Sequence, residues 1–252
     1  MSKAELVVRL PAEARGLSQT EEYCMVALNG HEWAVRLHDY REMYRVPGLY
    51  EKILSDTLHC TSPDVVASLL TEQVAREGLS PSGLTVLEVG AGSGLAGAAL
   101  RRKGIETIVG IDIIEEARVA ARREHPSVYH AYYVEDLCHL SHQTRKELRA
   151  YQFNCLMCVS ALGLNHVPAE VFAHGYNMVS DGGWVVFNVR EHSFEDCHAT
   201  GFIRLVQRMA AEGKMDIQVS RTYRHRFAVD STPINYTVLV ARKHEPIPLD
   251  RL

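Results

Sequence analysis

Short runs of β-branched and apolar residues alternate with helix-forming segments between residues 84 and 243. Runs of about four to eight such residues, bounded by Gly, Pro, Asp or Asn, are typical of buried strands. Strands that alternate with helices predict an α/β fold with a doubly wound, mostly parallel sheet. The expected strands cover residues 86–89, 107–112, 128–134, 153–159, 184–189, 215–222 and 234–241. The expected helices cover residues 95–103, 115–124, 144–151, 168–179 and 201–212.

The last two expected strands are separated by a segment that contains the turn-forming residues Asp230-Ser231-Thr232-Pro233. A connection this short joins strands that run in opposite directions, because a parallel pair needs a longer crossover. The pattern therefore predicts a seven-stranded sheet whose last strand is antiparallel.

A different pattern precedes this core. Two segments rich in Tyr, Val and Trp, residues 22–28 and 31–37, flank Asn29-Gly30. Asn-Gly is the preferred pair for a type I′ turn, so these segments predict a β-hairpin. An aromatic-rich segment at residues 38–50 follows, interrupted by Pro47-Gly48.

A helix is expected after the aromatic segment, with Ser62 as its N-cap, Pro63 at its first position and an end near residue 77. We therefore divide the chain into an N-terminal hairpin and helical cap, residues 1–80, and an α/β core, residues 81–252.

Composition indicates a globular enzyme without identifying its substrate. The 252 residues are 46% hydrophobic and 23% charged, with a formal net charge of −4. Basic residues occur in groups of two or three near expected helix ends, so we expect no nucleic-acid partner. No apolar stretch reaches membrane-spanning length and the N-terminus lacks a signal-peptide core, so we expect no membrane partner.

The six cysteines have no regular spacing, which is typical of a reducing compartment and predicts a cytoplasmic protein. Cys155 and Cys158 fall inside an expected central strand, where positions i and i+3 point to opposite faces. No second Cys or His pair stands at zinc spacing. We therefore interpret both as core residues and expect no metal site.

Three alternating glycines, Gly90, Gly92 and Gly94, follow the first core strand and precede a helix. A glycine-rich turn between a strand and a helix lets a ligand lie against bare backbone at the helix N-terminus. This loop predicts a nucleotide-like cofactor.

Two cofactor classes fit the glycines. The segment Gly92-Ser93-Gly94-Leu95-Ala96-Gly97 satisfies the G-x-G-x-x-G dinucleotide fingerprint, and Asp112 lies 20 positions beyond Gly92, where a ribose-binding acid is expected. An NAD(P)-dependent oxidoreductase is therefore one interpretation. However, Glu88 stands two residues before the first glycine. Its carboxylate would repel a pyrophosphate, whereas it would attract an ammonium group.

The register of Glu88 and the three glycines resembles motif I of the class I S-adenosylmethionine (SAM) methyltransferases. Acids also follow the next two strands, Asp112 and then Glu135-Asp136. The resemblance implies that Asp112 accepts the ribose hydroxyls and that Asp136, or Glu135 as second choice, binds the adenine amino group. Alternatively, both of these last acids only cap the loop before the next helix. The expected cofactor-binding residues are Tyr40, Tyr44, Tyr50, Glu88, Gly90, Gly92, Gly94, Asp112, Ile113, Asp136, Leu137 and Val159.

Tyr40, Tyr44 and Tyr50 have two interpretations. Their rings would form a lid over the positively charged sulfonium of SAM, which favours aromatic faces. Alternatively, they pack the N-terminal region onto the core.

Substrate residues are expected after the fourth and fifth core strands, because ligands of open α/β sheets bind beyond the carboxyl ends of the strands. His166 and His192 stand at these positions and are the candidate general bases. Asn165 is a candidate for binding the substrate, or else a helix cap. Arg221, Arg224 and Arg226 would bind an anionic substrate or protect an exposed strand edge, and we take Arg224 as the substrate-binding candidate.

The sequence thus predicts a SAM-dependent methyltransferase that acts on an oxygen, nitrogen or carboxylate of a small molecule, mainly by positioning the reactants. The Asn-Pro-Pro-Tyr signature of many amino methyltransferases is replaced by Ser160-Ala161-Leu162-Gly163. Two alternatives stay open beside the oxidoreductase: a SAM sensor, and an enzyme that uses SAM without transferring its methyl group. A homodimer also stays open.

Overall fold

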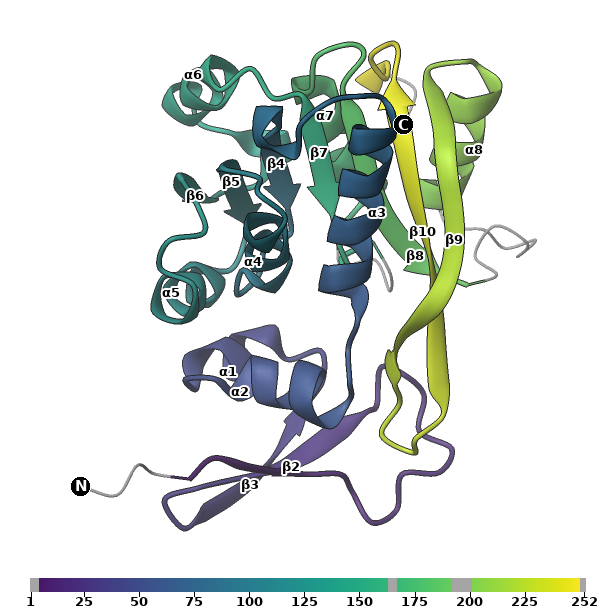
Figure 1. Cartoon of the computed structure of the whole chain (residues 1–252). Helices are drawn as coiled ribbons and strands as arrows, with labels where there is room; N and C mark the ends of the chain where they lie inside the picture. Colours follow the sequence, from purple (N-terminus) through teal and green to yellow (C-terminus); the bar gives the residue numbers. More distant parts are fainter. Residues whose placement is uncertain (1–4, 163–166, 192–200, 250–252) are drawn as a thin grey trace.

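The computed structural model describes residues 5–162, 167–191 and 201–249. The core is a seven-stranded sheet with the spatial order β6-β5-β4-β7-β8-β10-β9 (Figure 1). Its strands are β4 (Thr85–Val89), β5 (Thr107–Asp112), β6 (Ala131–Val134), β7 (Cys155–Cys158), β8 (Trp184–Arg190), β9 (Met215–Phe227) and β10 (Pro233–Lys243). Only β10 runs antiparallel to its two neighbours, β8 and β9, so the predicted fold class is confirmed.

Helices cover both faces of this sheet (Figure 1). Their bounds are α3 (Ser62–Arg76), α4 (Leu95–Arg102), α5 (Glu115–Glu124), α6 (His142–Ala150), α7 (Ala169–Met178) and α8 (Gly201–Ala211). Apolar residues of α3 and α4 pack with one side of the sheet. Those of α6, α7 and α8 pack with the other side. The arrangement is the doubly wound one that the alternating pattern predicts.

Alternate residues of the central strands belong to opposite hydrophobic clusters. Cys155 and Met157 of β7 contribute to the cluster under α3 and α4, whereas Leu156 and Cys158 contribute to the cluster under α7 and α8. Both cysteines are fully buried, and burial raises the pKa of their thiols. They are core residues, as predicted.

The N-terminal module, residues 5–60, carries its own small sheet and helices. Antiparallel strands β1 (Val7–Arg9), β2 (Tyr23–Leu28) and β3 (His31–Arg36) form the sheet, and Asn29 and Gly30 both have positive φ at the predicted hairpin turn. The aromatic segment then forms α1 (Tyr40–Arg45), α2 (Leu49–Glu51) and a π-helix (Lys52–Thr57). Sequence analysis did not identify β1 or these helices.

Helix α3 begins differently from expectation. Thr61, not Ser62, occupies the N-cap position, and Ser62 is fully buried inside the first turn. Pro63 is accordingly the second residue of the helix, one position later than predicted. The shift of one residue turns the Ser62 hydroxyl away from the helix end and toward β9, where it contacts Tyr223 and His225. The predicted N-terminal cap, residues 1–80, includes α3, but α3 packs on α4 and the core sheet. The boundary at residue 80 stays a prediction.

Strands β9 and β10 continue to pair with each other beyond the end of β8 and reach the N-terminal module (Figure 1). At the tip of this hairpin, Phe227 N–H donates to the carbonyl of Leu58 at 2.8 Å, and Thr61 N–H donates to the carbonyl of His225 at 2.8 Å. The strand predicted to end at residue 222 therefore continues to Phe227. The extra residues attach the module to the core.

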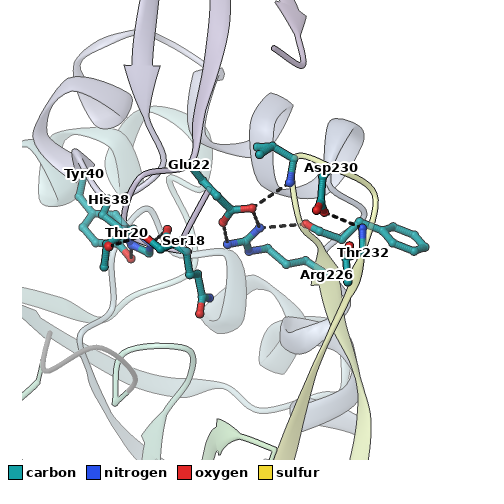
Figure 2. A network of polar contacts seen from close by, with 11 residues as sticks. Ser18, Thr20, Glu22, His38, Tyr40, Arg226, Asp230 and Thr232 are labelled. Carbon is teal, nitrogen blue, oxygen red and sulfur yellow. Dashed lines mark hydrogen bonds and ion pairs between the residues drawn. The ribbon is translucent and has the colours of Figure 1, made fainter. Parts of the chain in front are cut away.

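A buried ion pair completes this attachment. Glu22 and Arg226 are 2% and 3% exposed, and both carboxylate oxygens of Glu22 accept from the guanidinium (Figure 2). Val229 N–H donates to the same carboxylate at 2.8 Å, and the guanidinium also donates to the carbonyl of Phe227. Each charge is thus paired and hydrogen-bonded, as a buried charge requires.

In the described part of the chain, no helix is long and apolar enough to cross a membrane.

Candidate active site

A cavity of about 440 Å³ lies between the carboxyl ends of the core strands, the N-terminal module and the tip of the β9–β10 hairpin. The carboxyl ends of β4, β5, β6 and β7 contribute one part of its wall. The other part comes from the aromatic helices and from His225, Arg226 and Tyr236 of the hairpin. Ligand sites of open α/β sheets lie at this edge.

The predicted glycine loop follows β4 and lines the cavity. Gly90, Gly92 and Gly94 all have positive φ, which L side chains rarely adopt. A Cβ atom on Gly92 would lie 2.7 Å from the Tyr44 hydroxyl oxygen, and one on Gly90 would lie 2.9 Å from Ala161 Cβ. These two glycines are therefore needed both for the turn and for the close approach of their neighbours.

Four backbone amides of this loop are already hydrogen-bonded within the protein. Gly90 and Ala91 N–H donate to the Ile111 carbonyl, at 2.9 and 3.2 Å, and Gly94 N–H donates to the Ala91 carbonyl at 3.1 Å. Gly92 N–H donates to Asp112 Oδ2 at 2.9 Å. A pyrophosphate bound in the dinucleotide manner needs free amides at such a turn. These four amides are therefore not available to a pyrophosphate.

The acid at the end of β4, Glu88, is 2% exposed and lines the cavity. It accepts a hydrogen bond from the Tyr129 hydroxyl at 2.9 Å. Burial raises the pKa of Glu88 to about 8, and the nearby Asp112 carboxylate adds to the rise. A cationic group in the cavity would favour the ionised carboxylate.

Asp112, at the end of β5, is held by the backbone. Its Oδ2 accepts from Gly92 N–H, and its Oδ1 accepts from Ile114 N–H at 3.0 Å. Burial raises the pKa of this carboxyl, while the backbone donors oppose the rise. Each oxygen keeps acceptor capacity for a ligand hydroxyl. The structure therefore leaves Asp112 suited to its predicted role with a ribose.

Glu135 and Asp136, which follow β6, accept hydrogen bonds from the next loop and also line the cavity. Asp136 accepts from Cys138 N–H and from the His139 ring, each at 2.9 Å, and its pKa is lowered mainly by the bond to His139. Glu135 accepts from Ser141 N–H and from the Thr144 hydroxyl. Both acids also line the cavity. The capping interpretation thus describes their internal bonds, and the adenine role of Asp136 stays a prediction.

Two side chains at the cavity lack protein partners in a way that indicates a ligand. Ser93 is 1% exposed, and its hydroxyl has no hydrogen-bond partner among the described residues. A buried polar group normally has one. Ile113, in contrast, is apolar but 63% exposed at the cavity wall. A nucleoside would supply a polar atom for the Ser93 hydroxyl. Its flat base would cover the Ile113 side chain.

Tyr40, Tyr44 and Tyr50 all line the cavity and contact one another, with ring centroids 5.0–6.4 Å apart. They also pack against Ala117 and Ala120 of α5. The two interpretations of these tyrosines are therefore compatible in the structure, because the packing surface and the cavity wall are made by the same rings.

Ion pairs attach the tyrosine-bearing helices to α5. Glu116 accepts from Arg45 at 2.8 Å and from Arg41 at 3.4 Å, and Glu51 lies 2.6 Å from the His125 ring. The module is thus joined to the core at α5 as well as at the β9–β10 tip.

The remaining candidate residues divide into three groups. Ile113, Leu137 and Val159 line the cavity, as do Glu88, Gly90, Gly92, Asp112 and Asp136. Gly94 is not part of the wall, because it faces Tyr129 at the start of α4. His166, Asn165 and His192 lie outside the described residues.

Arg224 is also absent from the cavity wall, whereas Arg226 is present. The guanidinium of Arg224 lies over the Phe227 ring, 4.4 Å from its centroid. A β-bulge explains why two arginines with even spacing diverge. Ile234 pairs with Arg226 and Asn235 pairs with Arg224, so that His225 is an extra residue that interrupts the alternation.

The fold and the site together define an α/β enzyme class with a nucleoside cofactor at the strand ends. A family model described as a methyltransferase domain matches residues 63–230. Because the match covers more than half of the chain, the protein belongs to this family and is a SAM-dependent methyltransferase. No curated protein sequence matches the chain.

Two solved structures share the fold. Magnesium protoporphyrin IX methyltransferase from Synechocystis PCC 6803, with bound SAM, is 16% identical, with 72% of this chain and 79% of that chain covered and a TM-score of 0.50. A SAM-dependent methyltransferase from Clostridium acetobutylicum ATCC 824 is 8% identical, with 78% and 97% covered and a TM-score of 0.53. At these identities the likeness concerns the fold alone.

Membership of the family sets aside the oxidoreductase interpretation, and the sheet agrees. The dinucleotide-binding fold continues with a sixth parallel strand at its edge. Here, antiparallel β10 lies between β8 and β9 instead.

Proposed function

We propose that this methyltransferase acts on a small molecule, which binds in the half of the cavity formed by the N-terminal module and the β9–β10 tip. We call this half the acceptor half. Its wall combines aliphatic and aromatic side chains with several polar groups, the kinds of residue that line small-molecule sites. Its residues include Leu37, His38, Leu54, Cys60, His225, Arg226 and Tyr236.

The observation that carries this proposal is the cover over the site. The tyrosine-bearing helices are attached to α5, and the module is attached to the hairpin through Glu22 and Arg226. An RNA or a folded protein would have to displace these attachments to place an atom in the cavity. A small acceptor needs no such displacement.

The cofactor's place follows from the polar groups at the strand ends. Asp112 would hold the ribose hydroxyls, Ser93 would donate to or accept from the nucleoside, and Ile113 would cover the base. Glu88 would face a cationic group. SAM, when bound, supplies an electrophilic methyl group and leaves as S-adenosylhomocysteine.

The protein's own contribution is to bind, orient and exclude water. Positioning two reactants can supply roughly 7–11 kcal/mol, so transfer to an oxygen, nitrogen or carboxylate does not depend on a strong base. His166 and His192 remain the candidate general bases from the sequence. Cytoplasmic location also remains an expectation from cysteine usage.

Ligand-dependent unfolding tests the cofactor first. SAM and S-adenosylhomocysteine should each raise the melting temperature, whereas NADH and NADPH should not. A ligand at a hundred times its dissociation constant adds about 2.7 kcal/mol. For a chain of this size the shift is about 5–10 °C. Stabilisation by the nicotinamides alone would contradict the assignment of the cofactor site.

Product analysis with a small-molecule library then tests the acceptor class. Turnover should yield S-adenosylhomocysteine with at least one small acid, phenol or amine, and none with total RNA or protein extract as acceptor. Methylthioadenosine as product would indicate a reaction of another SAM carbon, and binding without turnover of any acceptor would indicate a sensor. His166→Ala and His192→Ala, assayed on the acceptor found, would identify the base by loss of turnover.

A further inference from the structure

His225 enters the acceptor half because of the β-bulge in β9. As the extra residue opposite Ile234 and Asn235, it breaks the inside-outside alternation of the strand. Its ring is buried, lines the cavity and stacks on Tyr236 with centroids 4.1 Å apart. Bulges often re-aim a side chain next to an active site.

A chain of hydrogen bonds reaches the Nδ1 edge of this ring. It starts at Asn188 in β8, which is fully buried. Ser160 N–H donates to Asn188 Oδ1 at 2.6 Å. A backbone N–H can only donate, so this bond fixes which end of the amide is oxygen and which is nitrogen. Asn188 Nδ2 therefore donates on its other side.

The direction of each following bond is then determined. Asn188 Nδ2 has two hydrogens, and we assign them to its two shorter contacts, the Tyr223 hydroxyl at 2.7 Å and Ser62 Oγ at 3.2 Å, rather than to Ser160 Oγ at 3.4 Å. The Tyr223 hydroxyl lies 2.6 Å from Ser62 Oγ and gives its own hydrogen to it. Ser62 Oγ has two lone pairs, and these two donors occupy them.

Ser62 is left with one hydrogen, and His225 Nδ1 lies 2.6 Å away. Ser62 therefore donates to Nδ1, which must be the unprotonated nitrogen of the ring. The opposite direction would either leave the Tyr223 hydrogen without an acceptor among the described residues or require Asn188 Nδ2 to leave Ser62 Oγ for the more distant Ser160 Oγ. Burial, with a smaller effect of the Arg226 charge, lowers the pKa of His225 to about 3, so the ring is neutral.

A neutral imidazole carries one hydrogen, and here it is on Nε2. Nε2 makes no hydrogen bond to the described residues, and the ring lines the cavity. The group presented to a bound molecule at this point is thus a donor and not a base.

We propose that His225 Nε2–H binds an unprotonated oxygen of the methyl acceptor, either a carboxylate, a phenolate or a carbonyl oxygen. Asn188, Tyr223 and Ser62 are positioning residues that hold the ring in this tautomer. The proposal rests on the proposed function, because it names the class of acceptor that the same cavity takes. An alkylammonium group at this position would meet a donor and would be rejected.

The tautomer is measured by nitrogen NMR of the whole protein labelled at histidine, without any ligand. His225 is assigned by the signal that His225→Phe removes. We expect protonated Nε2 and unprotonated Nδ1 throughout pH 6–8. A ring protonated at Nδ1, or at both nitrogens, in this range would overturn the proposal.

Tyr223→Phe tests the positioning chain. The substitution removes the hydrogen that enters Ser62, so Ser62 becomes able to accept from Nδ1, and we expect the Nδ1-protonated tautomer to appear. A variant that lost only packing would keep the tautomer of the wild type. Thr222→Val, which removes a hydroxyl on the exposed side of β9 that bonds only to Thr237, is the matched control.

Benzoate and benzylamine, added separately to protein saturated with S-adenosylhomocysteine, test the acceptor class. Benzoate should shift the Nε2–H signal, and benzylamine should not. His225→Phe keeps the aromatic stacking and should weaken benzoate binding about tenfold, while His225→Gln, which retains an N–H donor, should recover most of it. Benzylamine binding at His225, or no effect of benzoate there, would overturn the proposal. Loss of stabilisation by SAM would instead contradict the proposed function, since the tautomer measurement needs no cofactor.

Discussion

Single residues at the cavity show two ways in which the folded protein holds a polar group ready for a ligand. Glu88 is buried with a raised pKa, and Ser93 is buried without a partner among the described residues. Both arrangements cost stability in the unliganded protein, and both are relieved when a bound molecule supplies the missing charge or hydrogen bond.

Glu88 makes the stability of the unliganded protein depend on pH. Its folded pKa of about 8 lies above the ordinary value of 4.5, so the folded state keeps a proton that the unfolded state releases. The free energy of unfolding gained from this retained proton is fully present below pH 4.5. It is lost as the pH rises from 4.5 to about 8, by about 1.4 kcal/mol per pH unit.

Urea unfolding of the wild type and of Glu88→Gln at pH 5, 6, 7 and 8 measures this dependence. The free energy of unfolding of the wild type should fall more steeply than that of the variant, because Gln cannot ionise. Asp112 also has a raised pKa and is present in both proteins, so its own titration contributes to both profiles. Parallel pH profiles would contradict the prediction.

Ser93→Ala should separate ligand binding from stability. The substitution removes a buried hydroxyl with no partner, so the free energy of unfolding should stay equal or rise slightly. The dissociation constant of SAM should rise by about fivefold to tenfold, as measured by calorimetry. Thr71→Val is the control, because the Thr71 hydroxyl donates to the Ala67 carbonyl far from the cavity. It should lower stability and leave SAM binding unchanged.

At the scale of the element, the packing of α4 on the sheet depends on a glycine that is not in the turn. A Cβ atom on Gly97 would lie 2.7 Å from Val128 Cγ1, 2.8 Å from the Tyr129 hydroxyl and 2.9 Å from Glu88 Oε2. The third glycine of the G-x-G-x-x-G match thus lets the helix approach the buried Glu88–Tyr129 pair.

Gly97→Ala should therefore destabilise the protein, although alanine is the better helix former. Overpacking costs typically 1–3 kcal/mol, which exceeds the helix-propensity gain of about 1 kcal/mol. Thermal unfolding measures the difference. Gly83→Ala, where a Cβ atom meets nothing within 4 Å, should change stability little. Equal melting temperatures for the two variants would show that α4 can move away.

The elements that could be predicted from the sequence are those that depend on residues close to one another in the chain. Strand-helix alternation, the Asn29-Gly30 hairpin and the acids at the ends of β4 and β5 depend on residues close in sequence, and the structure contains them all. Helix α5 even keeps its predicted limits, Glu115–Glu124. The cavity lining of most cofactor candidates follows from the same local pattern.

Features made by distant contacts were not predictable in this way. The tip of β9 continues to Phe227 because it bonds to Leu58, and the bulge at His225 is invisible in the sequence alternation. We take Arg224 as the substrate-binding candidate from the sequence, whereas Arg226 and His225 line the cavity in the structure. Ser62 looks like an N-cap for the same reason, because its partners on β9 are 161 and 163 residues away.

At the scale of the molecule, the Glu22–Arg226 pair joins the N-terminal module to the hairpin (Figure 2). Glu22→Gln leaves the buried guanidinium without its counter-charge and should cost about 3–5 kcal/mol. Urea unfolding gives the loss, and limited trypsin digestion should cleave the N-terminal module of the variant faster.

Glu32→Gln is the control for this prediction, since Glu32 pairs with Arg9 at the surface, where the two side chains are 50% and 64% exposed. A surface pair contributes about 0–1 kcal/mol. If Glu22→Gln lost no more stability than Glu32→Gln, the buried pair would not hold the module in place.

The Glu22–Arg226 pair can form only late in the synthesis of the chain. Glu22 leaves the ribosome 204 residues before Arg226, and β10, which lies between β8 and β9, is made later still. Contacts this distant in sequence form slowly, because a long loop must close before they stabilise anything. The nascent module therefore carries an unpaired acid and an open apolar surface through most of translation. The side of the cavity formed by the hairpin is thus completed late in synthesis, and we expect chaperones to bind the nascent chain at this module.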